Sequence, residues 1–231
     1  MKKALLRILN KDIKSVENLQ DIKVNFDEND MFNAQAYIIG PVGTIYENSI
    51  LLFSIHFPKN YPFAPPNVLY KPINNIRIHP NLYQNGKVCL SFLGTWSGPG
   101  WTSVMDISSI LLSIQSLLCE NPLRNEPGYE NIKGTLNENY NIVIQYNSIN
   151  SLIIDSYNNL PEIYNYFKED FKKHIIEKKE YILKKINDNI NIDNNIKLSI
   201  YGINENVNYL KLKKKYLEFI SSIDDSSTNK N

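Results

Sequence analysis

One stretch of the chain, NLYQNGKVCLSFLGTWSGPGW at residues 81–101, places a thiol in a loop rather than in a helix. Cys89 is one of two cysteines in the sequence, and glycines, a proline and two tryptophans surround it. Those residue types favour an ordered loop. The other cysteine, Cys119, ends the apolar run ISSILLSIQSLLC, where we expect an inert side chain that packs as a small hydrophobe. Cys89 is therefore the candidate nucleophile.

Asn81 lies eight residues before Cys89, within the tripeptide HPN formed by His79, Pro80 and Asn81. Attack on a thioester produces a tetrahedral oxyanion, and a carboxamide positioned in advance would stabilise that charge. The alternative is that Asn81 braces the loop through bonds to its backbone. The two roles are compatible, since a bracing Asn also fixes the geometry near the thiol.

The sequence shows no strong activation of this thiol. Thiolate formation is favoured by nearby positive charge, and only Lys87 lies close to Cys89 along the chain. Such a thiol suits thioester exchange, in which the incoming bond is already activated. Peptide hydrolysis needs a paired histidine base. His79 is close to the cysteine in sequence but is locked beside Pro80, and His56 and His174 have no evident link to it. A papain-like protease is therefore disfavoured.

Composition limits the other function classes. The chain has 231 residues, 42% of them hydrophobic, enough for one full-sized core with an appendage. Its 25 basic and 24 acidic residues nearly cancel, so we expect neither nucleic acid nor a membrane as a partner. No run approaches the roughly 18 apolar residues of a membrane span, and polar residues interrupt the N-terminal MKKALLRILNKD too early for a secretory signal. Two cysteines without a signal predict a reducing compartment.

The hydrophobic pattern predicts a helix, three strands and a long loop in the first half of the chain. Residues 2–17 form an amphipathic helix by the spacing of their apolar residues: Leu5, Ile8, Leu9, Ile13 and Val16. The segments IKVNF, FNAQAYII and SILLFSIHF predict strands, with a hairpin turn at 40–43. YPFAPPNVLY predicts a short edge strand at best, because of its prolines. Residues 71–105 lack periodicity and predict a long ordered loop that carries function.

Helical spacing returns after residue 105. Asp106 is the expected N-cap of a helix with an apolar stripe: Ile107, Ile110, Leu111, Ile114, Leu117 and Leu118. Further helices are predicted at about 138–157, from Pro161 to about 186, and at about 208–223. The Asn-rich residues 187–195 predict a polar spacer, and the residues after 223 a disordered tail. This order indicates an α+β fold with the helices at one face and end of an antiparallel sheet.

Three segments, taken in this order, resemble the ubiquitin-conjugating enzymes: GPVGTIYENSILLFSIHFPKNYPFAPPNVLY, HPNLYQNGKVCLSFL and ISSILLSIQSLLCENP. Each is modest evidence alone, whereas together they are highly specific. The stretch from NGKVCLSFLGTWSGPGW to LLCENPLRNEPGYE is similar to the Z-type members, which have an enlarged loop after the cysteine and a helical C-terminal extension. The resemblance spans residues 1–190 and, loosely, the last helix. It implies a four-stranded sheet, a catalytic domain at 1–190 (core about 1–160, later helices 161–186) and an extension at 191–231.

The resemblance assigns roles to three residues. Cys89 matches the thiol that receives the C-terminal carboxyl of the modifier from an ATP-dependent activating enzyme. Asn81 matches the asparagine assigned to oxyanion stabilisation or to ordering of the loop. Glu126 falls where the family has an acidic residue that orients and desolvates the attacking lysine; without the resemblance it would be read as a solvated loop carboxylate. The rest of the candidate active-site loop is His79, Pro80, Tyr83, Ser91 and Trp101, and Trp96 and Trp101 are expected to pin the enlarged segment.

Two surfaces also follow from the resemblance. The basic first helix matches the surface that docks the activating enzyme, through Lys2, Lys3, Arg7 and Lys11; the alternative is a solvated polar face. The segment after Trp101, with Thr102 and Ser103, and Phe63 match the surface that meets ligases; the alternative for Phe63 is core packing. The Tyr61–Pro62 bond is a candidate cis peptide, as in this family.

Some positions depart from the family pattern. Ser91 stands where many members have an acidic residue, which removes a local carboxylate. Thr102–Val104 reads TSV where the ligase-facing loop usually reads SPA, which puts ordinary ligase pairing in doubt. His79 follows the general pattern, whereas Z-type members tend to have Asn there.

The resemblance implies a transferase with two acyl transfers, first onto Cys89 and then to a substrate lysine. We expect a monomer in the cytoplasm or nucleus, no metal and no bound cofactor, since the activating enzyme consumes the ATP. Its expected partners are ubiquitin or a ubiquitin-like modifier, an activating enzyme, ligases and protein substrates. Two alternatives remain: a different ubiquitin-like modifier, or a non-catalytic ubiquitin-binding variant of the same fold. Variants of the second kind lack the cysteine.

Overall fold

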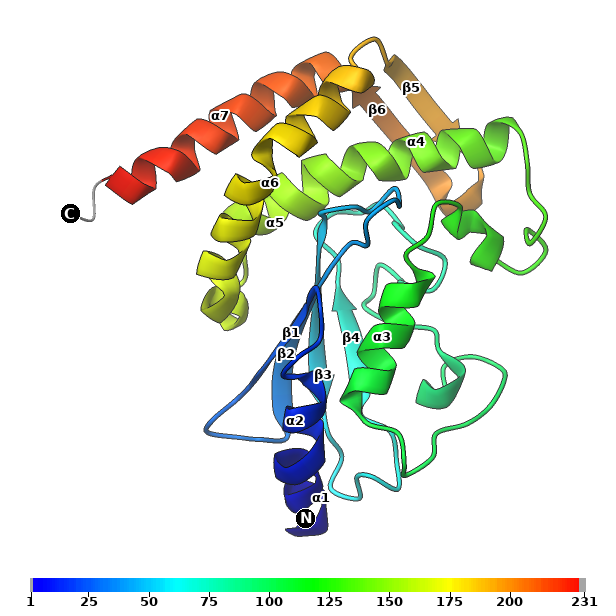
Figure 1. Cartoon of the computed structure of the whole chain (residues 1–231). Coiled ribbons are helices and arrows are strands. Elements are labelled where there is room, and N and C mark those ends of the chain that lie inside the picture. The colour runs from blue at the N-terminus through cyan, green and yellow to red at the C-terminus, as the bar shows by residue number, and fades with distance from the viewer. Residues whose placement is uncertain (1, 229–231) are drawn as a thin grey trace.

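The computed structural model describes residues 2–228 and is built on a four-stranded antiparallel sheet (Figure 1). Its strands lie in the order β1-β2-β3-β4: β1 (Ile22–Phe26), β2 (Asn33–Ile39), β3 (Ile50–His56) and β4 (Asn67–Lys71). Each strand pairs with the next, so that Ala36 of β2 faces Val24 on one side and Phe53 on the other. The predicted meander is confirmed, with β4 at an edge.

Burial follows the place of each strand in the sheet. The central strand β3 is buried almost continuously from Ile50 to Ile55, which indicates that other elements cover both of its faces. The edge strand β4 alternates, burying Val68 and Tyr70 and exposing Asn67, Leu69 and Lys71. Such alternation is typical of a strand with one face on the core.

The helices lie before and after the sheet in the chain and are listed here in order: α1 (Lys2–Arg7), α2 (Ile13–Val16), α3 (Ile107–Leu117), α4 (Thr135–Ile149), α5 (Ser156–Asn158), α6 (Lys168–Asp188) and α7 (Tyr209–Thr228). The π-helical segments η1 (Ile8–Asp12) and η4 (Asn150–Asp155) join α1 to α2 and α4 to α5. Short 3₁₀ turns are η2 (Ser91–Leu93), η3 (Pro122–Asn125), η5 (Glu162–Phe167) and η6 (Ile200–Gly202). Over residues 2–228, no helix has the length and apolar character that crossing a membrane requires.

The predicted helices are confirmed in position, but the first helix buries a different set of residues from the predicted one. Asp106 caps α3 as predicted, accepting a hydrogen bond from the Ser109 N–H. In the first helix the buried positions are four apart, at Ala4, Ile8, Asp12 and Val16, while Leu9 is 42% exposed. The π turn explains this difference, because its wider turn keeps residues spaced by four on one face. The prediction that Leu9 belongs to the apolar stripe was wrong.

The C-terminal part differs most from the prediction. Residues 187–195, which were expected to form a polar spacer, instead complete α6 and begin a β-hairpin. The hairpin consists of β5 (Asp193–Leu198) and β6 (Ile203–Asn208) and packs against α4. Polar asparagines hide the alternation that the buried Ile196 and Leu198 provide. The last helix, α7, runs alongside α6 (Figure 1) and continues to Thr228, past the predicted end at 223. The remainder of the predicted disordered tail, 229–231, lies outside the described residues.

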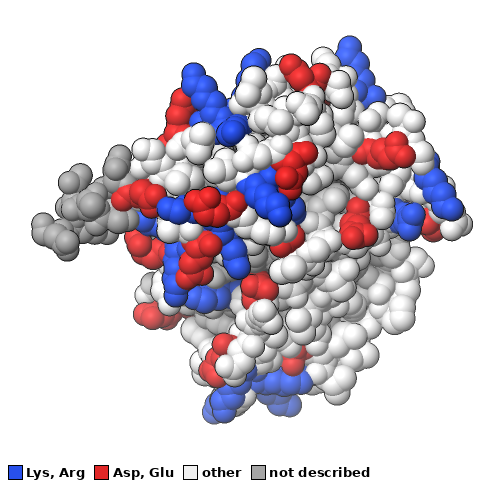
Figure 2. Space-filling view, turned by 45° about the horizontal axis from the view of Figure 1, so that its top comes forward, with Lys and Arg blue, Asp and Glu red and all other residues white. Residues whose placement is uncertain are grey.

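The surface charge is mixed on the face shown in Figure 2. Lysine and arginine side chains alternate there with aspartate and glutamate side chains, and neither sign forms an extended patch. This distribution matches the nearly equal numbers of basic and acidic residues in the sequence.

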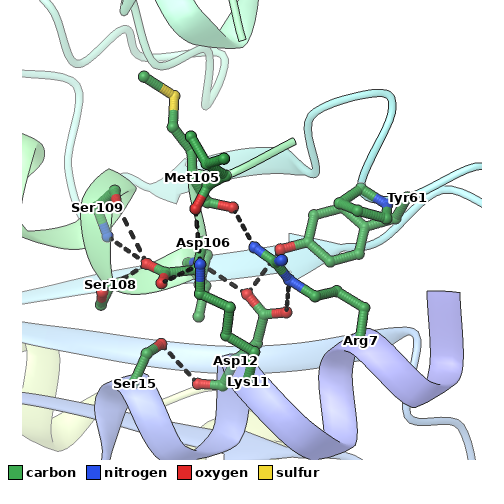
Figure 3. A network of polar contacts seen from close by, with 12 residues as sticks. Arg7, Lys11, Asp12, Ser15, Tyr61, Met105, Asp106, Ser108 and Ser109 are labelled. Carbon is green, nitrogen blue, oxygen red and sulfur yellow. Dashed lines mark hydrogen bonds and ion pairs between the residues drawn. The ribbon is translucent and has the colours of Figure 1, made fainter. Parts of the chain in front are cut away.

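Asp12 is a fully buried carboxylate that joins the first helix to the start of α3 (Figure 3). Its Oδ1 atom accepts hydrogen bonds from the Tyr61 hydroxyl at 2.6 Å and the Ile107 N–H at 3.0 Å, and its Oδ2 atom lies 3.6 Å from Arg7 Nε. Burial raises the pKa of Asp12, although the bonds from Tyr61 and Ile107 and the charge of Arg7 act in the opposite direction. The carboxylate thus holds together three segments that are distant in the sequence.

Replacing Asp12 with alanine is expected to lower the free energy of unfolding by about 3 kcal/mol or more, because the Tyr61 hydroxyl and the Ile107 N–H lose their acceptor and Arg7 loses its ion-pair partner. Urea unfolding followed by tryptophan fluorescence measures the change. The matched control is Asp170→Ala, which removes a partly exposed ion pair to Lys23 and should cost less than about 1 kcal/mol. If Asp12→Ala lowers the free energy of unfolding no more than the control does, Asp12 does not hold these segments together.

Candidate active site

Cys89 lies in the loop that connects β4 to α3, on a segment that runs beside the HPN tripeptide. Leu82, just after HPN, pairs with Val88, just before the cysteine, as an isolated antiparallel bridge. Gly86 allows the chain to reverse between them with a φ of 88°, a conformation that favours glycine. The loop is therefore a small, ordered hairpin that brings Asn81 next to Cys89.

Two reciprocal hydrogen bonds join Asn81 and Cys89. The Cys89 backbone N–H donates to the backbone carbonyl of Asn81 at 2.9 Å. In return, the Asn81 side-chain Nδ2 donates to the backbone carbonyl of Cys89 at 2.8 Å. The Asn81 carboxamide therefore braces the backbone of the cysteine. Its nitrogen carries a second N–H, so the bracing role leaves a donor for an oxyanion.

His79 is a structural residue of this loop rather than a base for the thiol. It is fully buried; its Nδ1 accepts a hydrogen bond from the Asn81 N–H at 3.0 Å, which leaves Nε2 to donate to the Leu117 carbonyl at 3.0 Å. Burial lowers the pKa of His79 to about 3, against a smaller raising effect of the bond to Leu117. The neutral ring anchors the HPN segment to the end of α3.

The thiol itself is covered. Cys89 is 1% exposed, and the enlarged loop is bonded to the residues on either side of it. Thr95 fastens this loop, because its hydroxyl donates to the Val88 carbonyl at 2.6 Å and accepts from the Leu90 N–H at 3.0 Å. Gly98 lies so close to Ser91 that a Cβ atom there would approach the Ser91 Cβ to 2.9 Å. Reaction at the thiol therefore requires a local opening of the structure around Cys89.

The two tryptophans of the loop differ in their surroundings. Trp101 donates from Nε1 to the Pro62 carbonyl at 2.7 Å and lies 6.0 Å from the Tyr61 ring, so it pins the end of the loop as expected. Trp96 is 45% exposed, which contradicts the expectation that it also pins the loop. The Tyr61–Pro62 peptide bond, a candidate from the sequence, is cis.

Glu126 follows the turn η3 and lies against the C-terminal hairpin. Its Oε2 accepts a hydrogen bond from the hydroxyl of Tyr201, a residue of η6 at the hairpin tip. The ring of Tyr201 also lies under the guanidinium of Arg77, 4.4 Å from its centroid, and Arg77 donates to the Pro80 carbonyl. Sequence reasoning missed Tyr201 and Arg77. The YG pair at 201–202, a turn signal between two short alternating runs, was the available indication of the hairpin.

The residues expected to dock partners fall into two groups. Lys2 and Lys3 are exposed, whereas Arg7 and Lys11 are partly buried and bind the chain just before α3. Arg7 donates to the Met105 carbonyl at 2.6 Å, and Lys11 donates to the Val104 carbonyl at 2.7 Å and lies 3.5 Å from Asp106 (Figure 3). Arg7 and Lys11 therefore also hold the first helix to the segment before α3.

The expected ligase-facing residues are on the surface. Phe63 is 72% exposed, which excludes the alternative that it packs in the core, and Thr102 and Ser103 are exposed as well. Cys119 differs from its prediction, because α3 ends at Leu117 and the second thiol is only partly buried. Asn125 Nδ2 lies 3.9 Å from its sulfur.

The family model described as "Ubiquitin-conjugating enzyme" matches residues 8–148. The chain belongs to the ubiquitin-conjugating enzyme family. The matched region includes the sheet, the HPN segment, Cys89, α3, Glu126 and nearly all of α4. The fold class predicted from the sequence is therefore confirmed, and the family supports a transferase role for this chain.

Similar proteins include Z-type members. The chain is 44% identical over 156 residues to the Homo sapiens protein "Ubiquitin-conjugating enzyme E2 Z", covering 65% of this chain and 44% of that one. It is 36% identical over 191 residues to a Caenorhabditis elegans "Probable ubiquitin-conjugating enzyme protein 17", covering 75% and 26%. The solved E2 domain of a Toxoplasma gondii ubiquitin conjugating enzyme is 27% identical, covering 54% of this chain and 79% of that one with a TM-score of 0.45. The chain spans less than half the length of the Z-type relatives it matches.

Thiol accessibility distinguishes the two cysteines. A maleimide is expected to modify Cys119 at least roughly tenfold faster than Cys89, because the buried thiol reacts only after local opening. Mass spectrometry of Cys89→Ala and Cys119→Ala follows each thiol alone. Equal rates, or a faster reaction at Cys89, would show that this thiol is not protected in the folded protein.

The buried neutral ring of His79 predicts a pH dependence of stability. Between pH 6.5 and about 3 the unfolded chain binds a proton at this residue that the folded protein does not, so its contribution to stability falls as the pH falls through this range. In His79→Gln, the slope of unfolding free energy against pH should decrease by up to about 1.4 kcal/mol per unit between about pH 4 and 6. An unchanged slope in His79→Gln would refute a buried neutral imidazole.

Proposed function

We propose that this chain accepts ubiquitin as a thioester on Cys89 and transfers it to a lysine of a protein substrate. The observation that carries the proposal is the reciprocal pair of hydrogen bonds between Cys89 and Asn81, within the region that matches the family model. These bonds fix the backbone at the thiol, and positioning of this kind accelerates a reaction whose acyl bond is already activated.

The first transfer moves the modifier onto this chain. The Cys89 sulfur loses its proton and attacks the carbonyl carbon that joins the modifier to a cysteine of the activating enzyme. A new C–S bond to Cys89 forms as the old C–S bond breaks, and the leaving thiolate of the activating enzyme takes up a proton. The second N–H of Asn81 would stabilise the oxyanion that forms between these events.

The second transfer moves the modifier to the substrate. A neutral lysine ε-amine attacks the thioester carbon, a C–N bond forms and the C–S bond to Cys89 breaks. The nitrogen gives up a proton to Glu126 or to water, and the Cys89 thiolate recovers a proton from solvent. Glu126 would orient the amine before attack and favour its neutral form.

The proposed reaction needs no metal and no cofactor bound to this chain, since ATP is consumed by the activating enzyme. Its partners would be the modifier, the activating enzyme, ligases and protein substrates. The chain would act as a monomer in the cytoplasm or nucleus. Lys2 and Lys3, which are exposed, remain available for docking the activating enzyme, and Phe63 is available for ligases. The cysteine itself counts against a non-catalytic variant of the fold.

A charging assay tests the proposal. With an activating enzyme, ATP and ubiquitin, we expect an adduct on a non-reducing gel that disappears on thiol treatment, is absent in Cys89→Ala and persists in Cys119→Ala. A panel of ubiquitin-like modifiers, each with its own activating enzyme, identifies the modifier if ubiquitin fails. Absence of any thioester across that panel would overturn the enzymatic function.

A further inference from the structure

The hairpin β5–β6 lies outside the matched region 8–148, yet its tip reaches Glu126, the candidate residue for orienting the attacking lysine. In Figure 1 the hairpin crosses α4 and descends to the turn that follows α3. There the Tyr201 hydroxyl donates to Glu126 Oε2. Burial and the neighbouring carboxylate raise the pKa of Tyr201 above its ordinary value, so the hydroxyl keeps its proton and remains a donor.

The same tyrosine is tied to the HPN segment through Arg77. The Arg77 guanidinium lies between two rings, 3.5 Å from the centroid of Tyr83 and 4.4 Å from that of Tyr201. It also donates to the Pro80 carbonyl, next to the residue that braces Cys89. Cation–π contacts of a partly desolvated guanidinium are favourable. The stack therefore links the Tyr201 ring, which bonds to Glu126, to the HPN segment.

The backbone at Tyr201 supports a role for its side chain. Its φ is 57° and its ψ is 9°, in the left-handed region, where bulky residues are rare and glycine or asparagine is usual. The next residue, Gly202, has a φ of 61° and completes the reversal. The ring is held in this place by an edge contact to Tyr140 of α4, with centroids 6.0 Å apart. Contacts of the side chain therefore outweigh an unfavourable backbone conformation.

We infer that Tyr201 is a positioning residue for lysine attack: the C-terminal hairpin holds the Glu126 carboxylate in place and so completes the active site. The inference rests on the function proposed above. The hydroxyl does not use up the carboxylate, because an ionised carboxylate has about four lone-pair sites and can accept from the lysine amine as well. The extension would thus act on the second transfer and leave the first one unaffected.

Single-turnover discharge of the Cys89 thioester tests this role. We expect Tyr201→Phe, which keeps the ring on Arg77 and removes the hydroxyl, to load at the wild-type rate and to discharge to free lysine roughly fivefold more slowly. Discharge to hydroxylamine, which is uncharged at neutral pH and needs no desolvation, should stay at the wild-type rate. A general structural defect would slow both nucleophiles.

A double-mutant cycle tests whether Tyr201 acts through Glu126. Glu126→Gln should slow lysine discharge by on the order of tenfold or more, and adding Tyr201→Phe should slow it no further, because residues that act through one another are not additive. The matched control is Tyr181→Phe, which removes a second tyrosine hydroxyl bound to a carboxylate, at 2.7 Å from Glu47 Oε2 on a different part of the molecule. It should discharge like the wild type to both nucleophiles.

The outcomes separate the two proposals. A wild-type protein that forms no thioester with any modifier overturns both. A wild-type protein that loads and discharges, with Tyr201→Phe equal to it towards lysine, overturns the positioning role alone. Faster lysine discharge in Tyr201→Phe would also overturn it, since the hydroxyl would then block Glu126 rather than position it. Additive effects of the two substitutions would show that Tyr201 does not act through Glu126.

Discussion

The structure around Cys89 depends on one constraint: a loop of more than thirty residues between β4 and α3 must satisfy its backbone polar groups without a sheet or a long helix. Side chains meet this requirement. Asn81 bonds to the carbonyl of the cysteine, Thr95 bonds to the backbone on either side of it, and His79 joins the loop to the end of α3. The same residues that make the loop possible therefore decide where the thiol lies.

This constraint explains why polar residues at the site are mainly structural in the resting protein. A histidine near a cysteine suggests a catalytic pair, yet both nitrogens of His79 are bound to backbone groups and burial lowers its pKa to about 3. It cannot hold a proton taken from the thiol at neutral pH. Such a site suits an acyl group that arrives already activated, and it would not support hydrolysis of an unactivated peptide.

Much of the fold and the local geometry at the cysteine could be predicted from the sequence, because periodicity and the HPN spacing report on contacts between residues close in the chain. The four strands and the pairing of Asn81 with Cys89 are examples. The hairpin could not be found in the same way, since asparagines occupy its exposed positions and mask the alternation of Ile196 and Leu198. The link from Tyr201 to Glu126 spans 75 residues and has no local signature.

The anchors of the long loop lie at its two ends, and their placement indicates which part moves. Arg77 and its aromatic partners hold the first end, and the first helix holds the last end through Arg7 and Lys11. Between them, residues 96–100 are exposed, and the nearest side-chain bonds are those of Thr95 and Trp101. A segment with few buried contacts opens at low cost, whereas the HPN hairpin is braced on both sides. The enlarged loop is therefore the part of this region that shifts most readily, while the hydrogen bonds between Asn81 and Cys89 hold the HPN hairpin in place.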